Sequence, residues 1–272
     1  MKSRIRKVAK WGAVTLVVAV VLFGLYLSVF FFPYPLFPHH TEHAGFSVYS
    51  DREISQDFEF VLEDARFRVE GMELYRGGSN PRLFFCFSQR KFETLVKLAG
   101  KRYAGQALVI SAAHNAFFSE EGIEAIGRRN SGRPVNSRLQ GSWSAAIAHE
   151  VAHLQMIAVV GARGGRGMPR WKSEGYADFA ANLAATASDP EYEFSRRVEF
   201  LLDDDHWQPP ITTFDRRHFR WHLLVEYLCS VKGLTFGDLM DAGVTEESAR
   251  AEMMEWYSSL DSRTPRPPDT GN

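Results

Sequence analysis

His149-Glu150-Val151-Ala152-His153 lies in the middle of a mostly apolar stretch that runs from Trp143 to about Val160. The pattern predicts a helix that is apolar nearly all round and must therefore be buried. Positions i and i+4 share one face of a helix, so both imidazoles could reach a single metal ion. Buried polar groups without partners are costly, and a metal would satisfy these two. The alternative is a pair of helix histidines satisfied by neighbouring carboxylates.

A second polar segment, Trp171-Lys172-Ser173-Glu174-Gly175-Tyr176-Ala177-Asp178, begins a helix predicted to extend to about Ala185. The glycine-rich loop at residues 161–167 separates it from the first helix, so the two helices would run back alongside each other. A catalytic zinc site uses three protein ligands and keeps one open position for water. Glu174, 21 residues after His153, is the expected third ligand of one Zn²⁺. The alternative is an ordinary acid stabilised by the helix dipole.

Two further acidic residues have expected roles around this zinc ion. Asp178 lies four residues after Glu174 on the same helix face. It could accept a hydrogen bond from a zinc-bound imidazole and fix its tautomer, or it could be a solvated charge. Glu150 points to the flank of the histidine pair, where it could hold a water and act as general base.

These motifs resemble the gluzincin metallopeptidases, the thermolysin-like clan, in which Glu-x-x-x-Asp follows His-Glu-x-x-His after a short gap. The surrounding Trp-x-x-Glu-Gly-x-Ala resembles compact members of that clan, and the match covers residues 143–178. Metzincins would need a glycine and a third histidine where Met156 and Val159 stand. The resemblance implies a zincin-like fold with zinc on His149, His153 and Glu174, Glu150 as base, and Asp178 bonded to His149.

Peptide hydrolysis also requires a donor to the negative tetrahedral oxygen. Enzymes of this clan place a Tyr or His there from a later helix, and His218 precedes a predicted helix from Phe219 to Val231 at about the matching distance. We therefore expect His218 to be the second catalytic residue, with His222 and Tyr176 as rivals. The alternative is a surface residue in a basic run.

The N-terminus predicts a membrane anchor. Residues 1–10 carry five Lys and Arg, and the uncharged residues 11–32 would span about 33 Å as a helix, against a hydrocarbon core of about 30 Å. No Lys or Arg follows until Arg52, which places the N-terminus in the cytoplasm and the rest in the periplasm or outside the cell. A cleaved signal peptide is the alternative, but the apolar run is long and no small-x-small site follows it.

The remaining chain predicts an α+β domain over residues 45–258, with a small mixed sheet, the motif helix and a C-terminal helical half. Strands are expected at residues 46–50, 83–87 and 107–111, with helices from Ile54 to Val69 and after Ser88. Residues 33–44 are expected to be a proline-rich linker, with His39, His40 and His43 solvated rather than metal-binding. Residues 115–141 are expected to be loop-rich, and residues 259–272 a disordered tail.

Composition narrows the possible partners. The net charge is −1 over 272 residues, which does not suggest nucleic acid binding. The expected partners are a peptide or protein substrate and the lipid bilayer, while Arg128, Arg129, Arg133 and Arg138 could bind an acidic group. Cys86 and Cys229 could form a disulfide outside the cytoplasm, but spacing does not decide it. Two alternatives to a zinc peptidase stay open: a zinc amidase acting on a non-protein amide such as cell-wall peptide, and an inactive zinc-binding scaffold.

Overall fold

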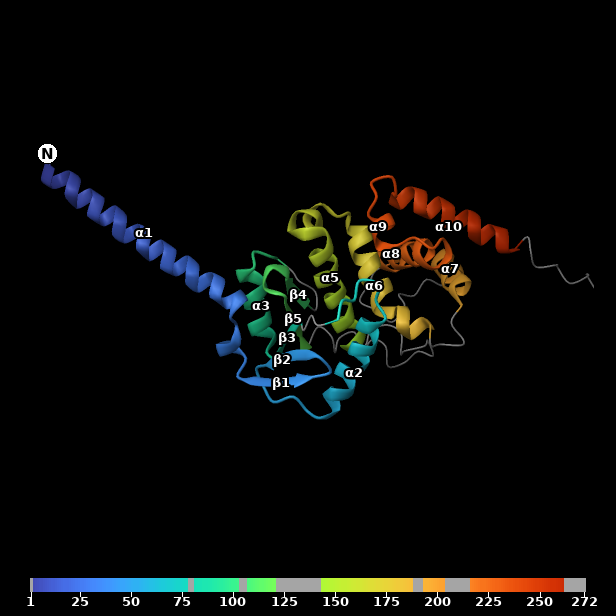
Figure 1. Cartoon of the computed structure of the whole chain (residues 1–272), viewed down its shortest axis with the longest axis horizontal. Coiled ribbons are helices and arrows are strands. Elements are labelled where there is room, and N and C mark those ends of the chain that lie inside the picture. The colour runs from blue at the N-terminus through green and yellow to red at the C-terminus, as the bar shows by residue number, and fades with distance from the viewer. Residues whose placement is uncertain are drawn as a thin grey trace, which may run out of the picture.

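The computed structural model describes residues 2–77, 81–102, 107–120, 143–187, 193–203 and 216–261. The chain is a mixed α/β protein, in which one five-stranded sheet lies between a long N-terminal helix and a group of packed helices (Figure 1). The basic loop with Arg128, Arg129, Arg133 and Arg138 and most of the expected tail lie outside the described residues.

The sheet has the strand order β1-β2-β3-β5-β4. Strands β2 (Phe46–Ser50), β3 (Arg82–Cys86) and β5 (Asn115–Ser119) are parallel, and β1 (His39–His43) and β4 (Ala107–Ile110) pair antiparallel at the two edges. The sheet is therefore mixed, as expected. Two of its strands come from segments for which we expected no strand.

Strand β5 lies at the start of residues 115–141, which the sequence predicts to be loop-rich. Instead it is a central strand, because Ala116-Phe117-Phe118 is buried on both faces and pairs with the apolar β3. Strand β1 occupies part of the expected linker, and its pairing of His39 with Ser50 and His43 with Phe46 makes it an edge strand of the domain. The domain therefore begins before residue 45. His43 lies 3.5 Å from Glu63, and His40 bonds Glu42 and stacks on Tyr49.

The two central strands send alternate phenylalanines to opposite faces of the sheet, as the period of two requires. Phe85 and Phe118 stack with ring centroids 5.1 Å apart and join the main core with α2 (Asp57–Glu70) and α5 (Trp143–Gly167). Phe84 and Phe117 stack at 4.8 Å on the other face, in a second core with α3 (Gln89–Leu98). Ser88 accepts a hydrogen bond from Lys91 N and caps α3, as expected.

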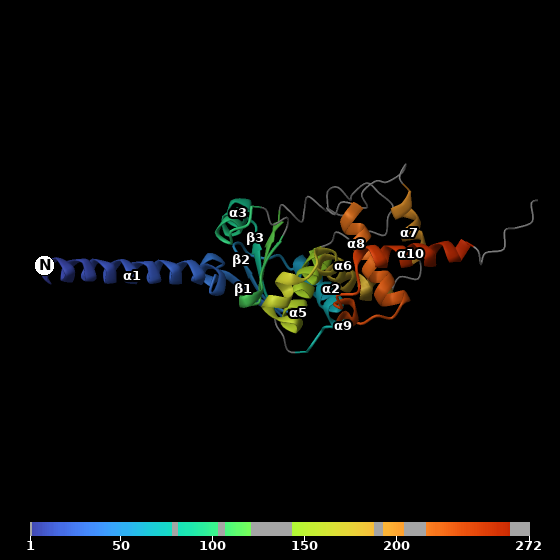
Figure 2. The same ribbon diagram turned by 90° about the horizontal axis from the view of Figure 1, so that it is seen from above.

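Helix α1 (Lys2–Phe31) projects away from the rest of the molecule in both views (Figures 1 and 2). Its segment Lys10–Phe31 has a mean hydropathy of 2.6, and only 6% of its residues are buried, so it is long and apolar enough to cross a membrane. Trp143–Gly161 is also long and apolar enough, but 56% of its residues are buried and it belongs to the core helix α5. A single turn, η1 (Tyr34–Leu36), connects α1 to β1.

The helical half follows α5. Its elements are α6 (Arg170–Ala187), α7 (Phe194–Leu202), α8 (Arg216–Glu226), the π-helical η3 (Tyr227–Val231), α9 (Phe236–Leu239) and α10 (Glu246–Asp261). The last helix extends into the expected tail. Cys86 and Cys229 are free thiols in different cores.

Gly161 explains the end of the first helical segment. Its φ of 75° and ψ of 167° interrupt α5 where the glycine-rich run begins. The following residues return to helical geometry up to Gly167, so the expected loop is a short further helical segment. This break separates the helix that carries the histidines from α6, which packs beside it.

Candidate metal centre

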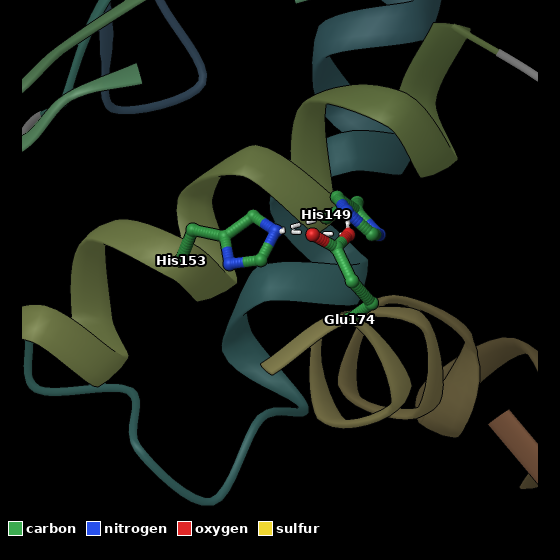
Figure 3. Close-up of side chains that lie close together, drawn as sticks. All are labelled: His149, His153 and Glu174. Atoms are coloured by element: carbon green, nitrogen blue, oxygen red, sulfur yellow. Dashed lines mark hydrogen bonds and ion pairs between the residues drawn. The ribbon is translucent and has the colours of Figure 1, made fainter. Parts of the chain in front are cut away.

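Helix α5 places the two histidines of the motif one turn apart on one face. His149 is 8% exposed and His153 is half-buried, and their ring centroids lie 4.7 Å apart. Their Nε2 atoms are separated by 3.1 Å (Figure 3). The expectation that both rings can reach one point is therefore confirmed.

Glu174 reaches the same point from the first turns of α6 (Figure 3). Its Oε2 lies 3.5 Å from His149 Nε2 and 3.6 Å from His153 Nε2. Among the described residues, these three side chains are the one group of His, Cys, Asp or Glu close enough together to hold a metal ion. We call His149, His153 and Glu174 the metal group. The three histidines of β1 form no such group with other residues that the structure describes.

The outer ring nitrogens are held by two side chains of α6. His149 Nδ1 donates to Asp178 Oδ1 at 2.8 Å, and Asp178 is itself buried. His153 Nδ1 lies 3.4 Å from Ser173 Oγ. When Nδ1 carries the proton of a neutral imidazole, Nε2 carries a lone pair. Two imidazole lone pairs and a carboxylate oxygen then converge, and such a group is suited to a cation.

The charges of the site agree with this geometry. Burial by itself disfavours the ionised carboxylate of Glu174, but the neighbouring imidazoles of His149 and His153 outweigh this effect and hold the pKa of Glu174 well below its ordinary value. Burial lowers the pKa of His149, yet the carboxylates of Asp178 and Glu174 raise it well above the ordinary value. The surroundings thus favour a positive charge between the three side chains.

Glu150 lies next to His149 on α5 and is half-buried. Its side chain makes no hydrogen bond or ion pair with any residue that the structure describes, although its charge acts on His149. Its carboxylate is therefore not committed to a structural contact within the described chain.

The three candidates for an oxyanion donor lie in different surroundings. His218, in the first turn of α8, has Nε2 3.5 Å from Arg170. His222 is buried between Arg197 and Glu226, at 3.3 and 3.2 Å. Tyr176 is buried against Phe236 on the other side of α6, where burial and the charge of Glu73 raise its pKa. Of the three, only His218 contacts a residue, Arg170, that itself lies beside Glu174 of the metal group.

Two residues at the site were not expected from the sequence. Ser173 supports His153, as described above. Arg170 Nε lies 4.0 Å from Glu174 Oε1, the second oxygen of that carboxylate, and the guanidinium also contacts His218. Arg170 and Glu174 are four residues apart on one helix, and this spacing alone could have indicated the pair.

Gly175 allows α6 and α8 to approach closely beside Glu174. A Cβ at this position would lie 2.5 Å from the carbonyl oxygen of Trp221 and 2.8 Å from Cγ2 of Val225. Only glycine fits this contact without a shift. The glycine in the Glu-Gly-x-Ala segment is therefore explained by helix packing.

No protein-family model and no curated protein sequence matches this chain. The structure by itself defines a mixed α/β chain with one projecting apolar N-terminal helix. In it, two histidines and a glutamate form a group that could hold a metal ion.

Proposed function

We propose that this chain is a membrane-anchored zinc metallopeptidase of the gluzincin type. The observation that carries the proposal is the convergence of His149 Nε2, His153 Nε2 and Glu174 Oε2 within 3.6 Å of one another. The spacing of these residues and of Asp178 in the sequence agrees with the clan to which the motif is similar.

The separations of the three atoms favour zinc. Ligand atoms bound tetrahedrally to one zinc ion at 2.0–2.1 Å are about 3.3–3.4 Å apart. The distances of 3.1, 3.5 and 3.6 Å bracket this value. Two nitrogens and one oxygen also form a donor set of catalytic zinc sites, whereas structural sites are usually closed by four protein ligands.

The surrounding residues would orient the ligands and move protons. Asp178 holds the His149 ring through Nδ1, and Ser173 lies beside the corresponding atom of His153. A bound zinc ion lowers the pKa of water and polarises a substrate carbonyl. Glu150 would accept the proton of the attacking water and pass it to the leaving amine. His218 or Arg170 would donate to the tetrahedral oxygen, and Arg170 would do so as a permanent cation.

A peptide is the substrate class that the fold supports best. Strand β4 is an outer strand of the described sheet, and it packs on α5, the helix that carries the histidines and Glu150. An extended peptide can add to such an edge through main-chain hydrogen bonds. The charge difference between residues 1–10 and the segment after α1 supports a cytoplasmic N-terminus and a domain on the other side of the membrane.

The test uses the full chain purified in detergent. We expect one zinc per chain by elemental analysis and metal-dependent cleavage of a peptide library. Glu150→Gln should keep the zinc and lose hydrolysis by about 10²- to 10⁴-fold, because the proton acceptor is removed. His149→Ala should lose the zinc.

The results of these assays distinguish a zinc peptidase from a zinc amidase and from an inactive zinc-binding scaffold. Cleavage by Glu150→Gln at the rate of the parent chain would show that Glu150 is not the base. Cleavage of a cell-wall fragment without cleavage of peptides would keep the chemistry and change the substrate class. Zinc without turnover on either substrate would indicate a binding scaffold.

A further inference from the structure

The C-terminal end of α1 is part of the domain. Tyr26 Oη donates to the carbonyl oxygen of Leu98 at 2.8 Å, which joins α1 to the last turn of α3. Asn115 Nδ2 donates to the carbonyl oxygen of Phe30 at 2.7 Å, and both residues are buried. The apolar helix therefore carries the domain without a flexible tether.

This attachment begins within the apolar run itself. Tyr26 is 16 residues beyond Lys10, so the helix between them is about 24 Å long at 1.5 Å per residue. The hydrocarbon core of a bilayer is about 30 Å thick, and tilting would shorten the span further. Once α1 crosses a membrane, Tyr26 and the end of α3 bonded to it lie at the level of the lipid headgroups or below.

The end of α3 has the chemistry of a membrane-facing surface. Leu98 is 40% exposed, and Lys97, Lys101 and Arg102 are exposed around it. No Asp or Glu occurs between residues 94 and 102. Lys and Arg can bury their stems while their charges reach anionic headgroups, and an exposed leucine can enter the acyl boundary. Both views place α3 beside the junction of α1 with the domain (Figures 1 and 2).

We propose that residues 97–102, the last two residues of α3 and the four that follow it, dock on the leaflet into which the C-terminal end of α1 emerges. Leu98 enters the interface, and Lys97, Lys101 and Arg102 bind anionic lipid headgroups. The inference rests on the membrane anchor in the proposed function and is independent of the zinc chemistry. The domain is thereby held against the membrane at two points, which fixes its orientation.

The test places an environment-sensitive fluorophore on single introduced cysteines of the full chain, with the parent chain giving the background of Cys86 and Cys229. The variants are Leu98→Cys, Leu22→Cys within α1, and Glu255→Cys on α10, which lies far from α1 in both views. Each is reconstituted into phosphatidylcholine vesicles with and without phosphatidylglycerol. Quenching by brominated lipids then reports contact with the bilayer.

We expect strong quenching at position 22, several-fold more quenching at position 98 than at 255, and a further increase at 98 with phosphatidylglycerol. Replacing Lys97, Lys101 and Arg102 by Gln should remove that increase, and high salt should weaken it. Quenching at 98 as low as at 255, with position 22 quenched, overturns the docking and leaves the anchor standing. Position 22 without quenching overturns both. An unchanged increase in the triple variant overturns the headgroup contact.

Discussion

Gly175→Ala tests whether the close packing of α6 on α8 beside Glu174 determines both the stability of the fold and the positions of the zinc ligands. The added Cβ would lie 2.5 Å from Trp221 O and 2.9 Å from Trp221 C, while ordinary contacts begin at 3.4 Å. Because these are backbone atoms, no side-chain rotation relieves the overlap, and α6 and α8 must shift by about 1 Å. Overpacking of this kind costs about 1–3 kcal/mol of unfolding free energy. For a chain of this size the melting temperature should fall by about 2–12 °C.

The assay is thermal unfolding of the full chain in detergent with a chelator present, so that metal binding does not contribute to the change. Gly237→Ala is the matched control, since its Cβ would meet nothing closer than 3.6 Å in the short helix α9. The control should be neutral or slightly stabilising. Adding Val225→Ala to Gly175→Ala should recover only part of the loss, because the Trp221 carbonyl remains in the way.

A second measurement follows the metal group in the same variants. Glu174 is the neighbour of Gly175, so a shift of about 1 Å in α6 should disturb its distances to the imidazoles and weaken zinc binding. A melting temperature equal to that of the parent chain, together with unchanged zinc affinity, would refute the packing argument and with it this account of the glycine.

Three further outcomes are expected. Asp178→Asn keeps the shape of the side chain beside His149 but removes its charge. It should weaken zinc affinity, measured by competition with a chelator, by about 10- to 100-fold. Unchanged affinity would contradict the role of Asp178. Zinc at 1,000 times its Kd should stabilise the chain by about 4 kcal/mol, so chelation should lower the melting temperature, and a metal-independent value would count against the site. Asn115→Ala leaves the Phe30 carbonyl without its buried donor and should lower the free energy of unfolding in denaturant by about 1–3 kcal/mol. A decrease below about 0.5 kcal/mol, the effect of an ordinary surface substitution, would show that this hydrogen bond does not stabilise the fold.

The metal group could be predicted from the sequence because its geometry is local. His149 and His153 lie one helical turn apart, and Glu174 and Asp178 repeat this spacing on the next helix. The packing of α5 against α6 then brings the two pairs together. The contact of Arg170 with His218 could not be predicted in this way, because it joins α6 to α8 across 48 residues.

The fold was predicted less completely where the chain lacks alternating or helical patterning. The short apolar run at Ala116–Phe118 follows β4 after a single turn, η2 (Ser111–Ala113), and nothing local distinguishes it from a loop. Strand β1 contains His-His-Thr-Glu-His, whose polar side chains are those of a linker, and only its pairing with β2 makes it a strand. Both segments become strands through pairing with residues distant in the sequence, and this pairing cannot be read from their own composition.

The stacked phenylalanines have a consequence for strand register. Since β3 and β5 carry Phe on both faces, sliding β5 by one residue would still bury an aromatic ring on each side, and apolar patterning alone would tolerate the slip. A slip of one residue would break hydrogen bonds at both ends of β5. Asn115 is bonded to the Phe30 carbonyl at one end, and Ser119 Oγ donates to Gln89 Oε1 at 2.6 Å at the other. Two hydrogen bonds from opposite ends of one short strand thus lock the alignment of the whole aromatic layer.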